Sequence, residues 1–107
     1  MKVITEGHTY ELDHFENYGL PGVAVQKLQF IHKEPAEPGS KELETICDGT
    51  TNEEVLRVLI DRMNYLQNKF PCRENAIVIT KLEESLMWLE KRTANRKARN
   101  VEGTHAA

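Results

Sequence analysis

The sequence predicts an α+β fold, in which a small N-terminal antiparallel β-sheet is followed by an antiparallel two-helix hairpin. Apolar residues alternate with polar ones in the first 48 residues, and from residue 49 onward they recur at intervals of three and four. The 107 residues are predicted to form a single domain, with the sheet in 1–48 and the hairpin in 49–103. A domain of this size has a thin core, so we expect the chain to form oligomers.

The first half of the chain predicts two strands and a short third one. Residues 3–16 form the first, because Tyr10, Leu12 and His14 alternate with polar residues. Residues 22–34 form the second, with apolar side chains on both faces, and LETIC, residues 43–47, forms the third. NYGLPG, residues 17–22, is a turn signal, and residues 33–42 are a loop rich in Pro, Gly and charge. Such a sheet needs an apolar layer against it, which we expect the helices to supply.

The second half predicts two helices. The first begins at Thr51 or Asn52, where either side chain suits an N-cap, and Pro71 ends it. Its apolar seam consists of Leu56, Leu59, Met63, Leu66 and Phe70. The second helix lies in residues 72–99, and the same spacing continues through Ile79, Leu82, Leu86, Leu89 and Thr93. Two matched seams with a short connection predict an antiparallel hairpin.

Each predicted helix also has apolar residues outside its seam. These residues are Val55, Val58, Ile77, Met87 and Trp88. One partner helix cannot cover both the seam and this second group, so the surplus is expected to meet the sheet or another subunit.

Five basic residues follow one another near the C-terminus, at Lys91, Arg92, Arg96, Lys97 and Arg99. The chain as a whole is acidic, with 17 Asp and Glu against 14 Lys and Arg, which argues against binding DNA or RNA. Cations near the end of a helix stabilise it by roughly 0.3 to 1 kcal/mol each, which is the simplest explanation of the cluster. The alternative is a small anion, because the three arginines share one helix face while the two lysines suit a solvated role.

The sequence has no motif of an enzyme or a metal site. HExxH, a Gly-rich phosphate loop and GxSxG are all absent, and Glu83 and Glu84 diverge on their helix rather than forming a carboxylate pair. The histidines have no metal-ligand spacing and favour structural or surface roles; they are His8, His14, His32 and His105. We therefore predict no catalytic residues, no metal and no cofactor. Free thiols at Cys47 and Cys72, without a signal peptide or a membrane-spanning stretch, predict a cytosolic protein.

Polar residues continue the second helix's seam at both ends, with Asn75 before Ile79 and Arg96 after Thr93. Asn75 suits the capping of the second helix, or recognition of a purine-like ring by its amide. Tyr65 and Phe70 suit the hairpin core or edge, or stacking on that ring. An arginine such as Arg92 matches a pyrophosphate better than a lysine does.

One long stretch resembles a helical hairpin shared by two groups of phage immune-evasion sponges; it is ENAIVITKLEESLMWLEKRTANRKARNVEGT. The resemblance rests on its ENA start, on LEE, on WL followed by RT, and on the closing R-x-V-E-G-T. One group counters Thoeris defence and the other counters CBASS. Strand patterning followed by DGTTNEEVLRVLIDRMNYLQNKFP resembles the Thoeris anti-defence group, because the anti-CBASS group is mostly helical. The resemblance extends over nearly the whole sequence.

This resemblance implies a protein that captures a signalling nucleotide, a cyclic ADP-ribose isomer, in the cytoplasm of the infected bacterium without degrading it. It also implies a homodimer, or a hexamer built as a trimer of dimers, and cyclic di- or trinucleotides as ligands of a separate pocket. The residues that match the family's motifs are Tyr65 or Phe70 for stacking, Asn75 for polar contacts and Arg92 for phosphate. Arg96 and Arg99 complete the candidate ligand-binding set.

Three alternatives remain open from the sequence. An anti-CBASS sponge would bind cyclic oligonucleotides only. A protein-interaction module would use the surplus apolar helix surface. A small enzyme would alter a nucleotide rather than hold it.

Overall fold

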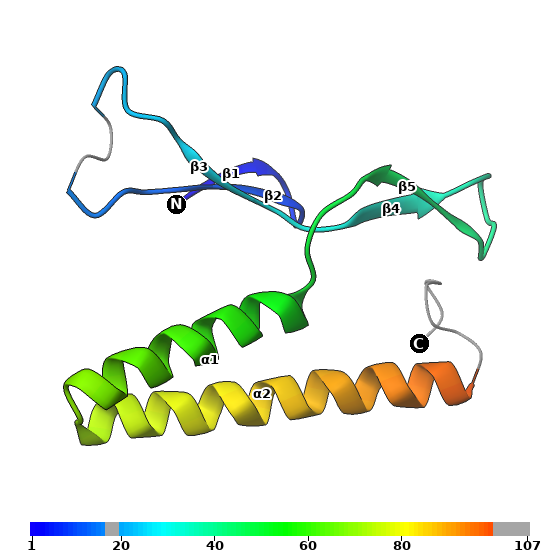
Figure 1. The fold of residues 1–107 in the computed structure, drawn as a ribbon. Helices are drawn as coiled ribbons and strands as arrows, with labels where there is room; N and C mark the ends of the chain where they lie inside the picture. The colour runs from blue at the N-terminus through cyan, green and yellow to red at the C-terminus, as the bar shows by residue number, and fades with distance from the viewer. Residues whose placement is uncertain (17–19, 100–107) are drawn as a thin grey trace.

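The computed structural model describes residues 1–16 and 20–99. Strands occupy the first half and two helices the second, which confirms the α+β class (Figure 1). The strands are β1 Lys2–Thr5, β2 Thr9–Leu12, β3 Gln26–Gln29, β4 His32–Pro35 and β5 Leu43–Cys47. The helices are α1 Asn52–Lys69 and α2 Arg73–Ala98. The predicted turn at residues 17–22 lies partly outside the described residues, and residues 100–107 lie wholly outside them.

The predicted single sheet is two sheets, and this prediction was wrong. The first predicted strand folds back on itself as β1 and β2, because Gly7 adopts a φ of 76° and His8 N–H donates to Thr5 O at 3.0 Å. The second predicted strand divides into β3 and β4. The antiparallel order β1-β2-β3 forms one sheet and the antiparallel pair β4-β5 forms the other. The third predicted strand, LETIC, is β5 and is confirmed.

A short crossing joins the two sheets to the start of α1. Phe30 and Thr50 form an isolated parallel bridge, Ile31 N–H donates to Thr50 O at 2.9 Å, and Thr50 N–H donates to Gln29 O at 2.9 Å. Gly49 lies so close to this backbone that an added Cβ would stand 2.7 Å from the carbonyl carbon of Phe30 and nearer still to Gln29 O. Only glycine fits there without a shift of the backbone.

We therefore expect Gly49→Ala to destabilise the crossing, by about 1–3 kcal/mol in the free energy of unfolding. Chemical denaturation of the variant measures this loss. Lys41→Ala, an exposed change in the loop between β4 and β5, is the control and should leave unfolding unchanged. Equal stability of the Gly49→Ala protein and the natural one would contradict the assignment of a tight crossing.

The helical hairpin forms as predicted. Thr51 caps α1, because its Oγ1 accepts from Glu54 N–H at 3.2 Å, and the helix ends at Phe70 before Pro71. At the connection, Gln67 donates to Cys72 O and accepts from Cys72 N–H, both at 3.0 Å. The Cys72 Sγ then caps α2 by accepting from Asn75 N–H at 3.4 Å. Side chains thus pair backbone groups that the connection would otherwise leave without partners.

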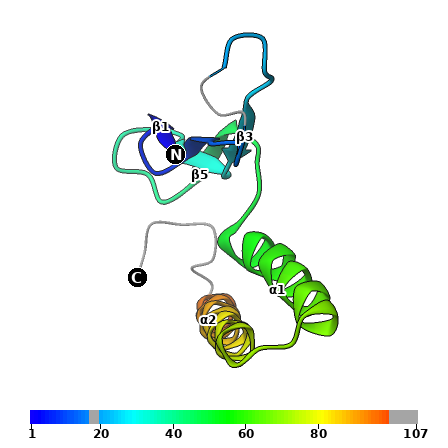
Figure 2. The same cartoon turned by 90° about the vertical axis from the view of Figure 1, so that its left-hand side faces the viewer.

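The two helices meet along the predicted seam. Its second-helix residues are all half-buried, whereas Leu59 and Phe70 of α1 remain 43% and 74% exposed. The helices lie closest at the connection and diverge toward the start of α1 (Figures 1 and 2). Near that open end, Arg57 Nη2 of α1 lies 3.5 Å from Glu90 Oε1 of α2.

The sheets form a layer of their own above the hairpin rather than packing directly on it (Figure 2). Among the described residues, no strand comes into close backbone contact with a helix, and no apolar side chain is buried. The expectation that helices would cover the sheet is therefore wrong for a single chain. The radius of gyration of 17.5 Å also exceeds the roughly 13 Å of a compact chain of this length.

We expect this chain to be an obligate oligomer, because residues 1–16 and 20–99 bury no apolar side chain that would offset their loss of conformational entropy. Val58, Met87 and Trp88 are apolar helix residues outside the seam, and their exposed fractions of 61%, 57% and 56% would fall on contact with a second copy. Sedimentation of a micromolar solution should show assemblies of two or more chains. A stable, folded monomer at that concentration would contradict the prediction.

Candidate functional site

Two adjoining cavities lie between the sheet layer and the open end of the hairpin. The larger, which we call the hairpin cavity, measures about 690 Å³ and is lined by β4, β5, the start of α1 and the end of α2. The smaller, the sheet cavity, measures about 360 Å³ and is lined by the β1–β2 turn, the crossing and the first residues of α1. Both are lined by Ile31, Thr51, Glu53 and Arg92. Their volumes fall in the range of small-molecule sites.

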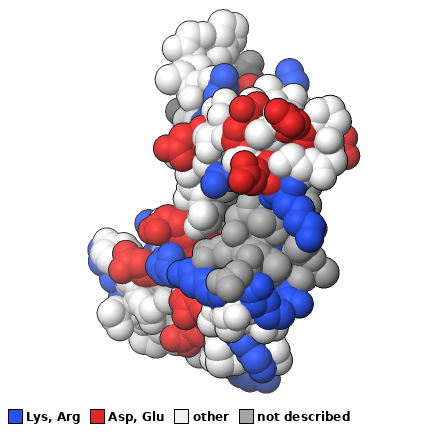
Figure 3. Space-filling model, turned by 90° about the vertical axis from the view of Figure 1, so that its right-hand side faces the viewer, with Lys and Arg blue, Asp and Glu red and all other residues white. Residues whose placement is uncertain are grey.

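The hairpin cavity is rich in positive charge. Its basic lining residues are Lys33, Arg57, Arg92, Arg96 and Lys97, against the acidic Glu53 and Glu90. Arg57 is already engaged by Glu54 and Glu90, each at 3.5 Å. Figure 3 shows this end of the molecule, where most basic side chains lie on the helical half and a group of acidic side chains covers the sheet above. The excess of basic over acidic lining residues favours an anion.

Arg92 lies where the two cavities adjoin. It is exposed, it lines both cavities, and it makes no hydrogen bond or ion pair with any residue in 1–16 or 20–99. Arg96, one turn further on, is only 7% exposed and is the one buried residue of the described chain. An exposed guanidinium whose five donors remain unused is well suited to bind a phosphate.

The structure brings only two of the six predicted site residues together. Arg92 and Arg96 line the hairpin cavity, while Arg99 caps the C-terminus of α2 and lines neither cavity. Lys97, predicted to be a solvated partner of the helix dipole, lines the hairpin cavity as well. Lys91 lines neither cavity, and its Nζ lies 4.9 Å from the centroid of the Trp88 ring.

The other three predicted residues lie toward the connection between the helices. Tyr65 is 49% exposed, with Lys69 Nζ 4.8 Å from its ring centroid, and Phe70 is the C-cap of α1. The Asn75 side chain is half-buried and has no hydrogen-bond partner among the described residues. Capping of α2 is performed by Cys72, so the capping alternative does not account for the Asn75 amide.

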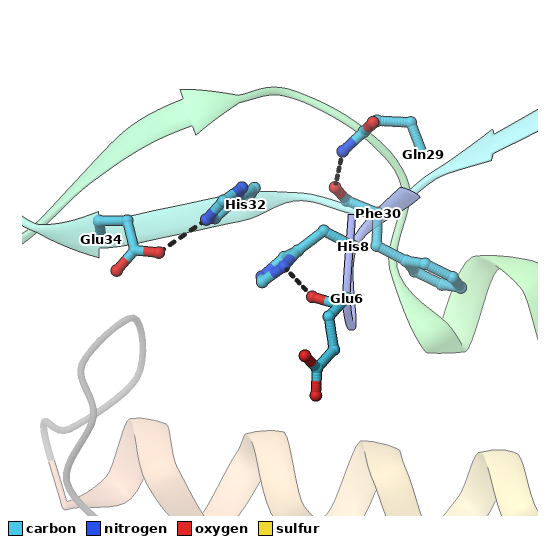
Figure 4. Close-up of polar contacts among 6 residues, drawn as sticks. All are labelled: Glu6, His8, Gln29, Phe30, His32 and Glu34. Atoms are coloured by element: carbon cyan, nitrogen blue, oxygen red, sulfur yellow. Dashed lines mark hydrogen bonds and ion pairs between the residues drawn. The ribbon is translucent and has the colours of Figure 1, made fainter. Parts of the chain in front are cut away.

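The sequence did not point to the sheet cavity, because its walls come from segments distant in the chain. Tyr10 and Phe30 form one wall, with ring centroids 5.9 Å apart in an edge-to-face arrangement. His8 stacks on His32 with centroids 3.7 Å apart, and His32 Nε2 lies 2.7 Å from Glu34 Oε1 (Figure 4). These histidines have a packing role at the junction of the two sheets.

His14 lies outside the stacked pair of His8 and His32. His14 Nε2 pairs with Ala24 O, and His105 lies outside the described residues. Nowhere in residues 1–16 and 20–99 do three His, Cys, Asp or Glu side chains gather as metal ligands would. Neither α1 nor α2, the helices of this part of the chain, has the long apolar stretch that crossing a bilayer requires.

Comparison with known proteins gives a consistent result. Residues 25–94 match the family model described as "Acb2/Tad1, hairpin domain", a range from the start of β3 to the last turns of α2. The protein named "Thoeris anti-defense 1", from Bacillus phage SBSphiJ7, is 59% identical to this chain over 60 residues. That alignment covers 55% of this chain and 42% of the relative, so the chain spans less than half of the relative's length.

Tyr65, Phe70, Asn75 and Arg92 lie inside the range that matches the family model, whereas Arg96, Arg99 and the closing R-x-V-E-G-T motif lie beyond it. The match is therefore shorter than the nearly complete resemblance expected from the sequence. It nevertheless includes the whole connection and both helical seams, on which the hairpin depends. The chain belongs to the Acb2/Tad1 hairpin domain family.

Proposed function

We propose that this chain is a phage anti-defence protein that sequesters the Thoeris signal, a cyclic ADP-ribose isomer, without degrading it. The observation that carries the proposal is the unused guanidinium of Arg92 at the junction of two cavities in a net basic environment. Holding the signal in the host cytoplasm would keep it from the effector that it activates. The name of the similar Bacillus phage protein supports the same biological role.

The ligand's chemistry fits the residues available. Its pyrophosphate matches the fork of an arginine, which makes two parallel charge-assisted hydrogen bonds. Its adenine offers a flat ring for an exposed aromatic side chain such as Tyr65, with Phe70 as the alternative, and donor and acceptor groups for the Asn75 amide. Arg96 adds positive charge to the hairpin cavity, whereas Arg99, the C-cap of α2, lies outside both cavities. No catalytic residue is needed for this role.

A single chain cannot apply all these residues to one ligand. Asn75 and Arg92 are 17 residues apart on α2, which corresponds to about 25 Å along the helix axis. A cyclic ADP-ribose isomer is too short to contact both side chains of one helix. We therefore infer that two copies pack with their hairpins reversed, so that Asn75 of one chain stands near Arg92 of the other. A hexamer would contain three such pairs.

Recovery of the ligand tests the proposal. The protein is incubated with a cyclic ADP-ribose isomer, filtered, denatured by heat, and the released small molecules are separated by chromatography. Intact ligand in the released fraction supports sequestration. An altered product would indicate an enzyme, and no retained ligand would contradict nucleotide capture altogether. Running cyclic di- and trinucleotides in parallel decides between Thoeris and CBASS signals.

The exposed apolar side chains favour one other candidate, a protein-interaction module. Met87 and Trp88 of α2 are more than half exposed and suit a partner protein's surface. Self-association would cover the same side chains. Sedimentation distinguishes the two, because a module for another protein remains monomeric alone and retains no nucleotide.

A further inference from the structure

The sheet cavity contains a set of polar groups that the proposed contacts of Tyr65, Asn75 and Arg92 do not explain. Glu53, the second residue of α1, is half-buried and lines both cavities. Its carboxylate makes no hydrogen bond or ion pair within residues 1–16 and 20–99, not even with Arg92. An unpaired carboxylate beside an unpaired guanidinium provides an acceptor and a donor in the same small space.

One wall of this cavity is aromatic. Tyr10 and Phe30 present their rings there, and the β1–β2 turn closes the end at His8. A sugar ring or a base has faces that pack on such rings and edges that carry hydrogen-bonding groups. The cavity of about 360 Å³ is large enough for a nucleoside and too small for a dinucleotide.

The presence of both Glu53 and Arg92 in the sheet cavity limits which ligands fit it. A free phosphate alone would be repelled by Glu53, whereas an uncharged sugar alone would leave Arg92 without a counter-charge. A phosphorylated sugar satisfies both, because its hydroxyls donate to the carboxylate and its phosphate accepts from the guanidinium. Asn52 and Glu53, in the first turn of α1, also line this cavity. The backbone N–H groups of a helix's first turn carry partial positive charge, which favours a phosphate nearby.

We propose that the sheet cavity is a ribose-phosphate subsite, in which Glu53 accepts hydrogen bonds from sugar hydroxyls while Arg92 holds the adjacent phosphate. This inference rests on the proposed function, because it assigns a specificity-determining residue to the Arg92 site. Glu53 selects ligands with a hydroxylated sugar next to the phosphate. Tyr10 and Phe30 support the sugar or base from the sheet side.

The test compares two probes that differ only in the sugar hydroxyls, adenosine 5′-monophosphate and its 2′,3′-dideoxy analogue. Binding of each to the full chain is followed by NMR titration, with the backbone amides of residues 50–53 as reporters. We expect the natural protein to prefer the hydroxylated probe by about fivefold, as for one or two hydrogen bonds in an open site. Glu53→Ala should abolish this preference, because alanine offers no acceptor to the sugar hydroxyls.

The matched control is Glu54→Ala, which removes a carboxylate from the same first turn of α1 but from outside both cavities. It should retain the preference. Equal affinity of the natural protein for both probes, no binding of either, or an unchanged preference in the Glu53→Ala protein would overturn the subsite. If the cyclic ADP-ribose isomer is still captured in those cases, the proposed function stands; if it is not captured, the function fails as well.

Discussion

Replacing Arg92 by alanine is expected to weaken capture of the cyclic ADP-ribose isomer by about one to two orders of magnitude. Charge-assisted hydrogen bonds contribute roughly 1.5 to 3 kcal/mol each, and a phosphate held by the guanidinium fork would lose them. The fold should be unaffected, because Arg92 is exposed and has no partner among the described residues. Calorimetric titration measures the change in affinity.

Two further variants decide what Arg92 contributes. Arg92→Lys keeps the charge but loses the fork, so it should still weaken binding, though less than alanine does. If Arg92 interacted only with the helix dipole, Arg92→Lys would leave the affinity for the ligand unchanged. Lys91→Ala is the matched control, because Lys91 is the neighbouring cation on α2 but lies outside both cavities, over the Trp88 ring. Equal losses for Arg92→Ala and Lys91→Ala would mean that the basic segment acts diffusely.

Asn75→Ala is expected to weaken capture about tenfold, because alanine cannot replace the hydrogen bonds of a base-reading amide. The cap of α2 should survive the change, since Cys72 Sγ accepts from the backbone N–H of residue 75 and not from its side chain. Asn68→Ala, an exposed amide near the end of α1, is the control. Unchanged titration of a folded Asn75→Ala protein would remove Asn75 from the site.

Mixing the two binding-deficient variants tests whether one site takes residues from two chains. In a mixed pair of Asn75→Ala and Arg92→Ala chains, one of the two sites keeps both natural residues and the other keeps neither. Co-refolding the variants should therefore restore part of the capture that each alone has lost. No restoration in an equimolar mixture would contradict a site that combines Asn75 of one chain with Arg92 of another.

The hairpin could be predicted from the sequence because its determinants are local. The three-four spacing from Leu56 to Phe70, the cap at Thr51 and the stop at Pro71 all act within one helix or one turn. The division of the strands could not be predicted so well. Alternation through residues 22–34 shows extended chain, but the crossing at Phe30 depends on Thr50 and Gly49, which come twenty residues later.

The candidate site shows the same limit. Motif resemblance indicated Arg92, and the helical spacing placed Arg96 near it, because both lie on one element. Glu53, Lys33 and Tyr10 reach the cavities only because the sheet layer stands above the open end of the hairpin. No periodicity within one element records that placement, so these residues could be identified only from the structure.

Native mass spectrometry of the protein with the cyclic ADP-ribose isomer tests nucleotide sequestration most directly, because one spectrum reports both the number of chains and the mass of what they hold. We predict assemblies of two or more chains whose mass rises, on addition of ligand, by whole multiples of the mass of the intact ligand. Two results would contradict sequestration: assemblies that bind no ligand when the ligand is in large excess over the protein, or assemblies that carry only a fragment of the ligand.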